Sequence, residues 1–305
     1  MKTGTVIRTA GNIYDVLSDG QTLRCRIRGR LRLKDIRTTN PVAVGDEVGV
    51  SADAAGEWSI ESVSPRRNYV IRRASNLSKE SHIIAANVDR ALLLVSLHSP
   101  ATPTEFVDRF LVTCEAYGVP VTVLLAKCDL LDDMRPQAEQ FMEVYRNAGY
   151  EVIEVSALRG DGMERVASIL GEGTTLLSGN SGVGKSTLVG AVCPGVEIRT
   201  GEVSASHLKG RHTTTYSTMY MLPSGGRIID TPGIKGFGLI DLEDVELRLF
   251  FPELRERGEE CRFRNCTHTR EPGCAVVPAV ERGEIAYQRY ESYLKMLDED
   301  GKYRK

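Results

Sequence analysis

Short segments in which hydrophobic and polar residues alternate occupy the first 68 positions of the chain. The alternation has the period of a β-strand, and turn residues such as Gly11-Asn12 separate the segments. Several strands at this spacing predict a small barrel or sandwich. Residues 69–85 show no clear period, and we interpret them as a linker. The predicted strands cover residues 5–10, 13–17, 22–28, 46–50 and 58–63.

From residue 87 the pattern changes to apolar strands that alternate with amphipathic helices. Repeated strand–helix units of this length predict a doubly wound parallel sheet, which we assign to residues 86–240. The strand pattern then ends, and residues 241–305 form helical segments around a cluster of cysteines and a histidine. The predicted strands are 90–97, 121–125, 151–155 and 174–177, and the predicted helices are 104–117, 136–148 and 163–170.

The composition is that of a globular chain without a membrane span. Of 305 residues, 41% are hydrophobic and 26% are charged, which excludes a disordered chain. The formal net charge of −2 gives no global sign of a nucleic-acid partner. The first ten residues hold no signal-peptide core, and no apolar run approaches the roughly 20 residues that a membrane helix needs. We therefore expect a cytoplasmic monomer with no membrane partner.

Basic residues recur at every second position in and after the third predicted strand. Side chains two residues apart project from one face of a strand, so these residues would form a stripe that binds RNA phosphates. The alternative is a solvated strand face, although such a face usually mixes charges of both signs. The stripe comprises Arg24, Arg26, Arg28, Arg30 and Arg32.

A glycine-rich loop follows the predicted strand 174–177 and precedes a helix-forming segment. It has the pattern G-x-x-x-x-G-K-[ST], in which backbone N–H groups and a helix N-terminus surround phosphate oxygens. Lys185 would reach the outer phosphates, and the Ser186 hydroxyl would bind Mg²⁺. The loop therefore predicts a nucleoside triphosphate site. Its residues are Gly179, Asn180, Ser181, Gly182, Val183, Gly184, Lys185, Ser186 and Thr187.

Two short motifs upstream of this loop indicate the base. Lys127-Cys128-Asp129 closes the predicted strand 121–125. A carboxylate there accepts two hydrogen bonds only from a base with an N1–H and a 2-amino group, so Asp129 selects guanine over adenine. Ser156-Ala157, after the predicted strand 151–155, matches the turn that lies over the guanine 6-oxo group. Together they favour GTP over ATP.

Two motifs downstream of the loop would contact Mg²⁺ and the γ-phosphate. Asp230-Thr-Pro-Gly233 ends a predicted strand at 226–229, where Asp230 can hold Mg²⁺ and the N–H of Gly233 can bind the γ-phosphate. Gly210–Thr215 is a candidate switch, and one of Thr213–Thr215, which we take to be Thr214, would complete the Mg²⁺ shell. Base motifs that precede the phosphate loop indicate a circular permutation. Such a permutation leaves the site intact, because every binding loop lies at the carboxyl edge of the sheet.

A candidate zinc site lies within fourteen residues of the C-terminal region. Three thiolates and an imidazole complete a tetrahedral shell and leave no position for water, so one structural Zn²⁺ is expected. The metal would hold a segment that has few large apolar residues of its own. The ligands would be Cys261, Cys266, His268 and Cys274.

The barrel, the permuted motif order, the Gly-Arg-His-Thr-Thr-Thr segment and the trailing Cys/His cluster together resemble the RsgA family of bacterial small-ribosomal-subunit biogenesis GTPases. The resemblance spans essentially the whole chain. It implies an N-terminal OB-fold, a circularly permuted P-loop GTPase core and a C-terminal helical zinc domain. It also implies GTP hydrolysis that the small ribosomal subunit stimulates during its late maturation, with rRNA as a contact.

Two positions depart from expected patterns: Ala126 departs from the usual motif, and Ile234 departs from Ras-like enzymes, although an apolar residue there resembles the habit of this family. Ala126 stands where an asparagine would contact guanine and brace the phosphate loop, which affects guanine affinity. Ile234 stands where Ras-like enzymes place a water-orienting glutamine, which implies slow intrinsic turnover. His212 is a candidate helper, and the alternative is an exposed loop histidine. The expected catalytic set is Lys185, Asp230, Gly233 and His212.

Two other functions remain open from the sequence. A P-loop ATPase or kinase would share the phosphate loop but would not need Asp129. A GTP-regulated RNA-binding module would share every motif and would hydrolyse little GTP.

Overall fold

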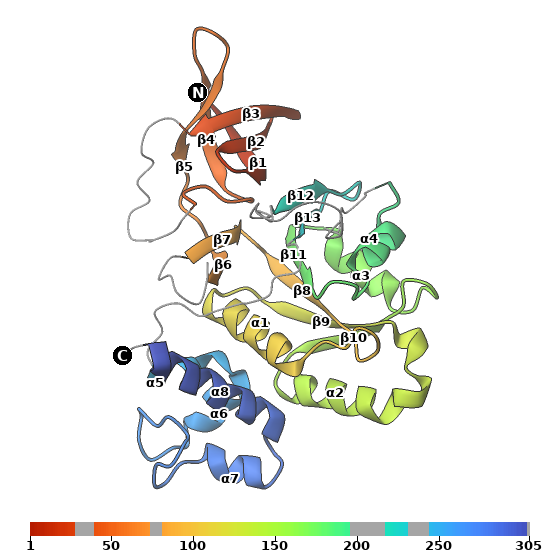
Figure 1. Ribbon diagram of the computed structural model, residues 1–305, viewed down its shortest axis with the longest axis vertical. Coiled ribbons are helices and arrows are strands. Elements are labelled where there is room, and N and C mark those ends of the chain that lie inside the picture. The colour runs from red at the N-terminus through yellow and green to blue at the C-terminus, as the bar shows by residue number, and fades with distance from the viewer. Residues whose placement is uncertain (28–39, 74–80, 196–216, 231–243, 304–305) are drawn as a thin grey trace, which may run out of the picture.

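The computed structural model describes residues 1–303 except for 28–39, 74–80, 196–216 and 231–243. Three regions follow one another along the long axis of the molecule: a barrel, a sheet flanked by helices, and a group of C-terminal helices (Figure 1). Some of the predicted site residues lie outside the described ranges: Arg28, Arg30, Arg32, His212, Thr214 and Gly233.

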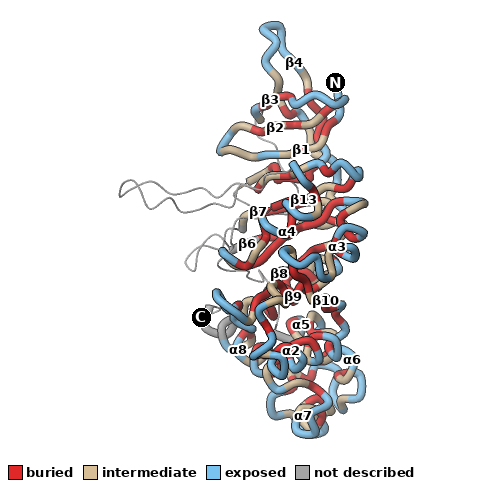
Figure 2. Tube along the Cα trace, turned by 90° about the vertical axis from the view of Figure 1, so that its right-hand side faces the viewer, coloured by how far each residue is buried: buried red, intermediate tan, exposed pale blue. Residues whose placement is uncertain are grey.

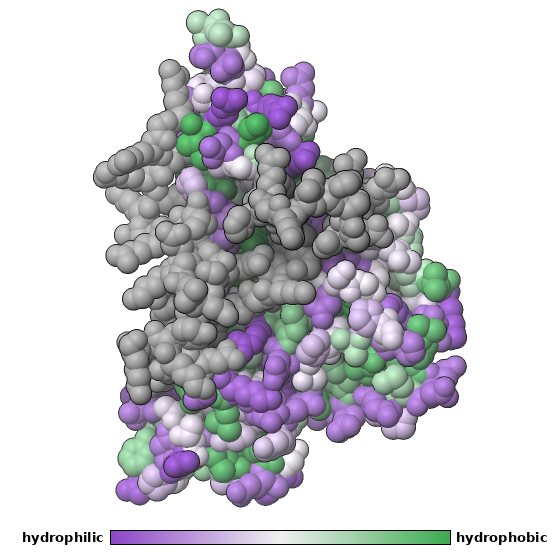
Figure 3. All heavy atoms as spheres, in the orientation of Figure 1, coloured by the Kyte–Doolittle hydropathy of each residue, from purple (hydrophilic) through white to green (hydrophobic). Residues whose placement is uncertain are grey.

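The N-terminal region is a closed five-stranded barrel, as the alternating pattern predicts. The strands are β1 (Lys2–Ala10), β2 (Ile13–Ser18), β3 (Gln21–Ile27), β4 (Glu47–Ala52) and β5 (Trp58–Val63). They pair in the order β1-β2-β3-β5-β4, and β4 pairs back with β1 to close the barrel. Inward residues such as Val16, Cys25 and Ile60 are fully buried and form the barrel core. Much of the exterior is hydrophilic on the face that Figure 3 shows.

The segment that we interpreted as a linker contains a β-hairpin, so that interpretation is wrong. Strands β6 (Tyr69–Arg73) and β7 (Ser81–Ala86) pair antiparallel. Val70 and Ile84 pack into the core of the α/β domain, whereas their neighbours Ile71 and Ile83 pack into a separate small cluster. Adjacent apolar residues are therefore buried on both faces, which removes the alternation that marks a half-exposed strand.

The central region has the doubly wound architecture that the strand–helix alternation predicts. Its parallel strands are β8 (Arg90–Val95), β9 (Val121–Ala126), β10 (Glu151–Val155), β11 (Thr174–Gly179) and β13 (Arg227–Asp230), in the order β10-β9-β8-β11-β13. Helices α1 (Thr104–Ala116) and α2 (Arg135–Asn147) cover one face, and α3 (Met163–Leu170) and α4 (Lys185–Val192) cover the other. The strands between these layers are largely buried (Figure 2).

One further strand joins the barrel to this sheet. Strand β12 (Thr218–Met221) pairs antiparallel with β13 and also with β1, where Arg8 lies opposite Thr218. The sheet is therefore continuous through both regions. The sequence pattern did not indicate this four-residue strand, which is too short to show a clear period.

The C-terminal helices pack against the α/β domain. They are α5 (Asp244–Leu247), α6 (Pro252–Gly258), α7 (Val276–Glu281) and α8 (Tyr287–Tyr303). Their apolar core includes Phe251 and Tyr293, and Val112 of α1 packs into the same cluster. The two regions thus share a hydrophobic interface. Among the described helices, none is both long and apolar enough to cross a membrane.

Candidate nucleotide site and metal centre

The predicted nucleotide motifs meet at one edge of the sheet. Lys127 follows β9, Ser156 follows β10, the glycine-rich loop follows β11, and Asp230 ends β13. Because these strands are parallel, their carboxyl ends lie along the same edge. The base motifs lie on the β9–β10 side and the phosphate motifs on the β11–β13 side, with β8 between them.

The two base motifs contact each other directly. The Ser156 hydroxyl donates a hydrogen bond to Oδ1 of Asp129 at 2.6 Å, and the backbone N–H of Arg159 donates to the Ser156 hydroxyl oxygen at 3.1 Å. The Arg159 side chain also donates to the backbone carbonyl of Asp129. These contacts hold the Asp129 carboxylate in one orientation, and an acceptor fixed in this way loses less entropy when a ligand binds it. The sequence analysis did not identify Arg159.

The glycine-rich loop has the backbone that its glycines permit. Gly179 has a φ of 150°, and a Cβ there would lie 2.7 Å from the carbonyl oxygen of Leu94 in β8. Gly182 and Gly184 have φ values of 76° and 109°. Only glycine adopts such angles readily, so the loop can curl around an anion. Val183 is fully buried and anchors the loop in the core beneath.

Lys185 folds back over its own loop. Its Nζ donates to the carbonyl oxygens of Gly179 at 2.6 Å and Asn180 at 3.3 Å, and the residue is only 5% exposed. Burial lowers the pKa of Lys185, and the Asp230 carboxylate partly opposes that effect. The cation thus lies inside the loop, at the place where an outer phosphate would bind.

Asp230 is a buried carboxylate with one oxygen that no described residue hydrogen-bonds. Its Oδ1 atom is inaccessible and has no hydrogen-bond partner among the described residues. Burial raises the pKa of Asp230 to about 6, and Lys185 lowers it in part. A buried carboxylate of this kind is costly unless a cation or donor reaches it. The residue therefore fits the role of a group that faces a divalent cation, directly or through water.

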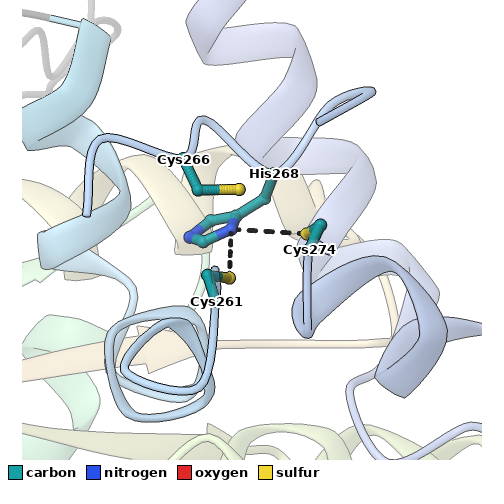
Figure 4. A group of neighbouring side chains, drawn as sticks. All are labelled: Cys261, Cys266, His268 and Cys274. Carbon is teal, nitrogen blue, oxygen red and sulfur yellow. Dashed lines mark hydrogen bonds between the residues drawn. The ribbon is translucent and has the colours of Figure 1, made fainter. Parts of the chain in front are cut away.

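The four predicted zinc ligands come together between α6 and α7 (Figure 4). One ligand atom from each residue lies within 4.8 Å of all the others. Nδ1 of His268 lies 3.6 Å from the Sγ atoms of both Cys261 and Cys274. Burial, helped by the nearby Arg248, lowers the pKa of His268 to about 4, which keeps the imidazole in its neutral, metal-binding form. The cluster is compatible with a zinc site of the Cys₃His type.

The loop that carries His268 is held from two sides. Tyr290 and Tyr293 of α8 donate hydrogen bonds at 2.6 Å to the backbone carbonyls of His268 and Thr267. Glu271 accepts hydrogen bonds from the Thr267 hydroxyl and from backbone N–H groups of the same loop. Desolvation acts to raise the pKa of Glu271, but these hydrogen bonds hold it at about 2. The loop is therefore shaped by its own residues and by α8.

Two arginines of the predicted basic stripe lie in the described part of the barrel. Arg24 and Arg26 are exposed in β3 and alternate with the inward residues Leu23 and Cys25. In the neighbouring strands, Asp15 lies opposite Arg24, and Ser59 lies opposite Arg26. The shared face is confirmed for these two arginines. An acidic residue opposite Arg24 also keeps open the alternative of a solvated face with mixed charges.

The sequence analysis missed the loop that follows β8. Ser99 of this loop accepts a hydrogen bond from Lys127 on the base side, and the ring of Pro100 lies near Gly182 on the phosphate side, 3.4 Å from where a Cβ of residue 182 would be. The sequence could have indicated this loop by its position, because it follows β8, one of the parallel strands whose carboxyl ends form the site.

Comparisons with known families agree with this arrangement. The model of the RsgA N-terminal domain matches residues 3–60, and the model of the RsgA GTPase matches residues 63–240. The second match starts before the β6–β7 hairpin, which agrees with the packing of Val70 and Ile84 into the α/β core.

Individual proteins are similar over nearly the whole chain. A small ribosomal subunit biogenesis GTPase RsgA from Bacteroides fragilis is 50% identical, with 99% of this chain and 98% of that protein covered. One from Flavobacterium johnsoniae is 42% identical, with 98% and 93% covered. The crystal structure of YjeQ from Thermotoga maritima has a TM-score of 0.75 at 33% identity and covers 98% of both chains. That of YloQ, a circularly permuted GTPase, has a TM-score of 0.71 at 31% identity and covers 100% of this chain and 96% of its own.

Proposed function

The chain belongs to the RsgA GTPase family, and on that premise we propose that it binds the small ribosomal subunit and hydrolyses GTP there during late maturation of the subunit. The observation that carries the proposal is that the motifs predicted to read the base and to bind phosphate meet at one edge of the sheet. Full-length similarity to proteins named for small-subunit biogenesis supports the choice of partner. We also infer that the chain acts in the cytoplasm, as a monomer.

Guanine is the base that the oriented Asp129 fits. The carboxylate accepts hydrogen bonds from the N1–H and the 2-amino group, while Ser156 and Ala157 form the turn over the 6-oxo group. Adenine offers neither donor to Asp129, so a site built around this carboxylate would lose both hydrogen bonds with adenine. A P-loop ATPase would not need a carboxylate at this position, so the arrangement favours GTP over ATP.

For phosphate binding and catalysis we assign roles to residues of three loops. The loop 179–187 surrounds the phosphates, Lys185 neutralises the outer ones, and Ser186, Thr214 and Asp230 hold Mg²⁺. When bound, Mg²⁺ supplies charge neutralisation at the phosphates. The N–H of Gly233 contacts the γ-phosphate, and His212 helps to position water because Ile234 has no polar group to do so.

The two flanking domains serve as docking elements in this proposal. The barrel, residues 1–68, contacts rRNA through Arg24, Arg26 and the further arginines at 28, 30 and 32. Residues 241–305 form a domain that one structural Zn²⁺ holds together through Cys261, Cys266, His268 and Cys274. The GTPase domain, which includes the β6–β7 hairpin, ends near residue 240.

The test is a hydrolysis assay with purified small ribosomal subunits. We expect slow GTP hydrolysis by the free chain, a large increase with small subunits, no such increase with large subunits, and no hydrolysis of ATP. Lys185→Ala should abolish activity, whereas Lys295→Ala, which removes an exposed lysine of α8, should not. Tight GTP binding without turnover in the presence of subunits would instead favour a GTP-regulated RNA-binding module.

The base assignment has its own test. Asp129→Asn replaces an acceptor with a group that is part donor, so GTP affinity should fall and xanthosine triphosphate affinity should rise. Asp132→Asn, at a nearby exposed carboxylate, is the matched control and should change neither affinity. Unchanged GTP affinity in Asp129→Asn would remove this residue from the base site.

A further inference from the structure

The loop that follows β8 occupies the centre of the nucleotide edge. Strand β8 lies between β9, which carries the Lys127 loop, and β11, which carries the phosphate loop. The residues that leave β8 therefore emerge between the two halves of the site. Nothing in the proposed function uses them.

This loop contacts the base half and lies beside the phosphate half. Nζ of Lys127 donates a hydrogen bond to the backbone carbonyl of Ser99 at 2.7 Å. On the other side, a Cβ placed on Gly182 would lie 3.4 Å from both Cγ and Cδ of Pro100, and no other described residue outside the chain neighbours of Gly182 lies within 4 Å of that point. The dipeptide Ser99-Pro100 thus accepts a hydrogen bond from the base loop through its carbonyl, and its ring lies beside the side of Gly182 where a Cβ would project.

The base of the loop is closed by two buried residues. The Thr102 N–H donates to the carbonyl of Ser96 at 2.7 Å, and the Ser96 N–H donates to the Thr102 hydroxyl oxygen at 3.1 Å. The Ser96 hydroxyl donates to the carbonyl of His98. Ser96 is 0% exposed and Thr102 is 6% exposed. A short loop closed in this way can hold Ser99-Pro100 at a set position between its neighbours.

Ala126 gives a reason why a link between the base loop and the phosphate loop through Ser99-Pro100 matters. The residue ends β9, is 5% exposed, and packs its methyl group among apolar side chains. A methyl group cannot make the hydrogen bonds by which an asparagine at this place would brace the phosphate loop against the base loop. Instead, the structure links Lys127 to Ser99 by a hydrogen bond and places the ring of the next residue, Pro100, beside Gly182.

We propose that Ser99-Pro100 is a positioning element for the nucleotide, which couples the base loop to the phosphate loop in place of the side chain that Ala126 lacks. The proposal rests on the GTP site described above. It predicts that Ser99-Pro100 affects guanine nucleotide affinity only while the side chain at position 126 cannot hydrogen-bond to the phosphate loop.

The experiment is a double-mutant cycle on GDP affinity in the full chain. Pro100→Ala removes the ring against Gly182, and Thr102→Val removes the acceptor that closes the loop. Each should raise the Kd for a fluorescent GDP analogue by about five- to tenfold in the Ala126 background. In the Ala126→Asn background each should raise it less than about twofold, because the two braces are redundant there. A purely structural role of the loop would give the same factor in both backgrounds, and that result would overturn the proposal.

Controls separate the possible failures. Thr113→Val removes a hydrogen bond within α1, remote from the site, and should leave the Kd unchanged in both backgrounds. If Ala126→Asn does not fold, Lys127→Met serves instead: Pro100→Ala should then weaken GDP binding far less when added to Lys127→Met than when made alone. Equal factors there would also overturn the proposal. Failure of the unaltered chain to bind GDP would count against the proposed function itself.

Discussion

Arg289 of α8 donates a hydrogen bond from Nη1 to Oδ1 of Asp108 in α1 at 2.7 Å, although the two residues are 181 positions apart. Their side chains are 1% and 0% exposed. Nε of Arg289 also donates to Glu253 of α6 at 2.7 Å, and the guanidinium lies 4.7 Å from the ring centroid of Phe251. One buried cation therefore ties the C-terminal helices to a helix of the GTPase domain.

Removal of this cation should destabilise the protein strongly. Arg289→Met leaves the carboxylates of Asp108 and Glu253 buried without their partner, which should lower the free energy of unfolding by about 3–5 kcal/mol. Urea denaturation followed by circular dichroism measures the loss. The matched control is Lys295→Ala, which breaks an exposed ion pair with Glu105 across the same interface and should cost less than about 1 kcal/mol. Equal effects of the two substitutions would mean that Arg289 does not link the domains.

The sequence predicted the elements whose signal is local. The helix over 104–117 is observed as Thr104–Ala116, because its apolar residues recur with the helical period on one face. The hairpin of β6 and β7 was missed because both of its faces are buried. The Arg289–Asp108 pair could not be predicted at all, since only the packing of α8 on α1 brings the residues together.

The same distinction holds within the site. The phosphate loop was predicted because its chemistry depends on neighbouring residues in a single turn. Ser99-Pro100 was missed because its contacts depend on the order of β9, β8 and β11 in the sheet, which no short motif encodes.

Asp230 should reduce the stability of the metal-free, nucleotide-free protein. Its pKa is about 6 in the folded chain and near the ordinary value of 3.8 when unfolded. The native state therefore binds more protons between these values, and stability falls as the pH rises through that window. With EDTA present, Asp230→Asn should be more stable than the unaltered chain by on the order of 1–3 kcal/mol at pH 8, and by less at pH 5. Thermal unfolding at both pH values measures the difference.

The same substitution should remove Mg²⁺-dependent GTP hydrolysis, so stability and activity should change in opposite directions. The assignment of Asp230 as a buried carboxylate that is destabilising without a bound cation would be contradicted by either of two results. Asp230→Asn could be less stable than the unaltered chain at pH 8, or its gain in stability could be the same at pH 8 and pH 5.

Glu271 should affect how tightly the C-terminal domain holds its metal. Glu271→Gln weakens acceptance of hydrogen bonds from Thr267 and Thr269, so the loop that presents His268 should loosen. Supporting residues of this kind typically change metal affinity about 10- to 100-fold. Competition with a chromogenic chelator measures the zinc affinity directly. Glu260→Gln, at an exposed carboxylate next to Cys261 that pairs with Arg257, should leave the affinity unchanged.

Arg24 and Arg26 allow the proposed rRNA contact to be tested with a matched pair. Both are exposed on the same face of β3, but Asp15 lies opposite Arg24 whereas the uncharged Ser59 lies opposite Arg26. A phosphate that contacts Arg26 therefore meets less competition from a protein carboxylate. Each phosphate contact releases counterions, so Arg26→Ser should weaken small-subunit binding and reduce the slope of log K against log[salt] by about 1. Arg24→Ser should have a smaller effect on both quantities.

Intrinsic GTP hydrolysis should stay the same in both variants, because β3 lies in the barrel, apart from Lys185 and Asp230. Subunit-stimulated hydrolysis should fall at limiting subunit concentration and recover at saturation if the barrel only docks the chain. Failure to recover would mean that the barrel also activates the nucleotide site, with the pairing of β1 with β12 as a direct route between them. Unchanged affinity and salt slope in Arg26→Ser would show that this strand face is merely solvated.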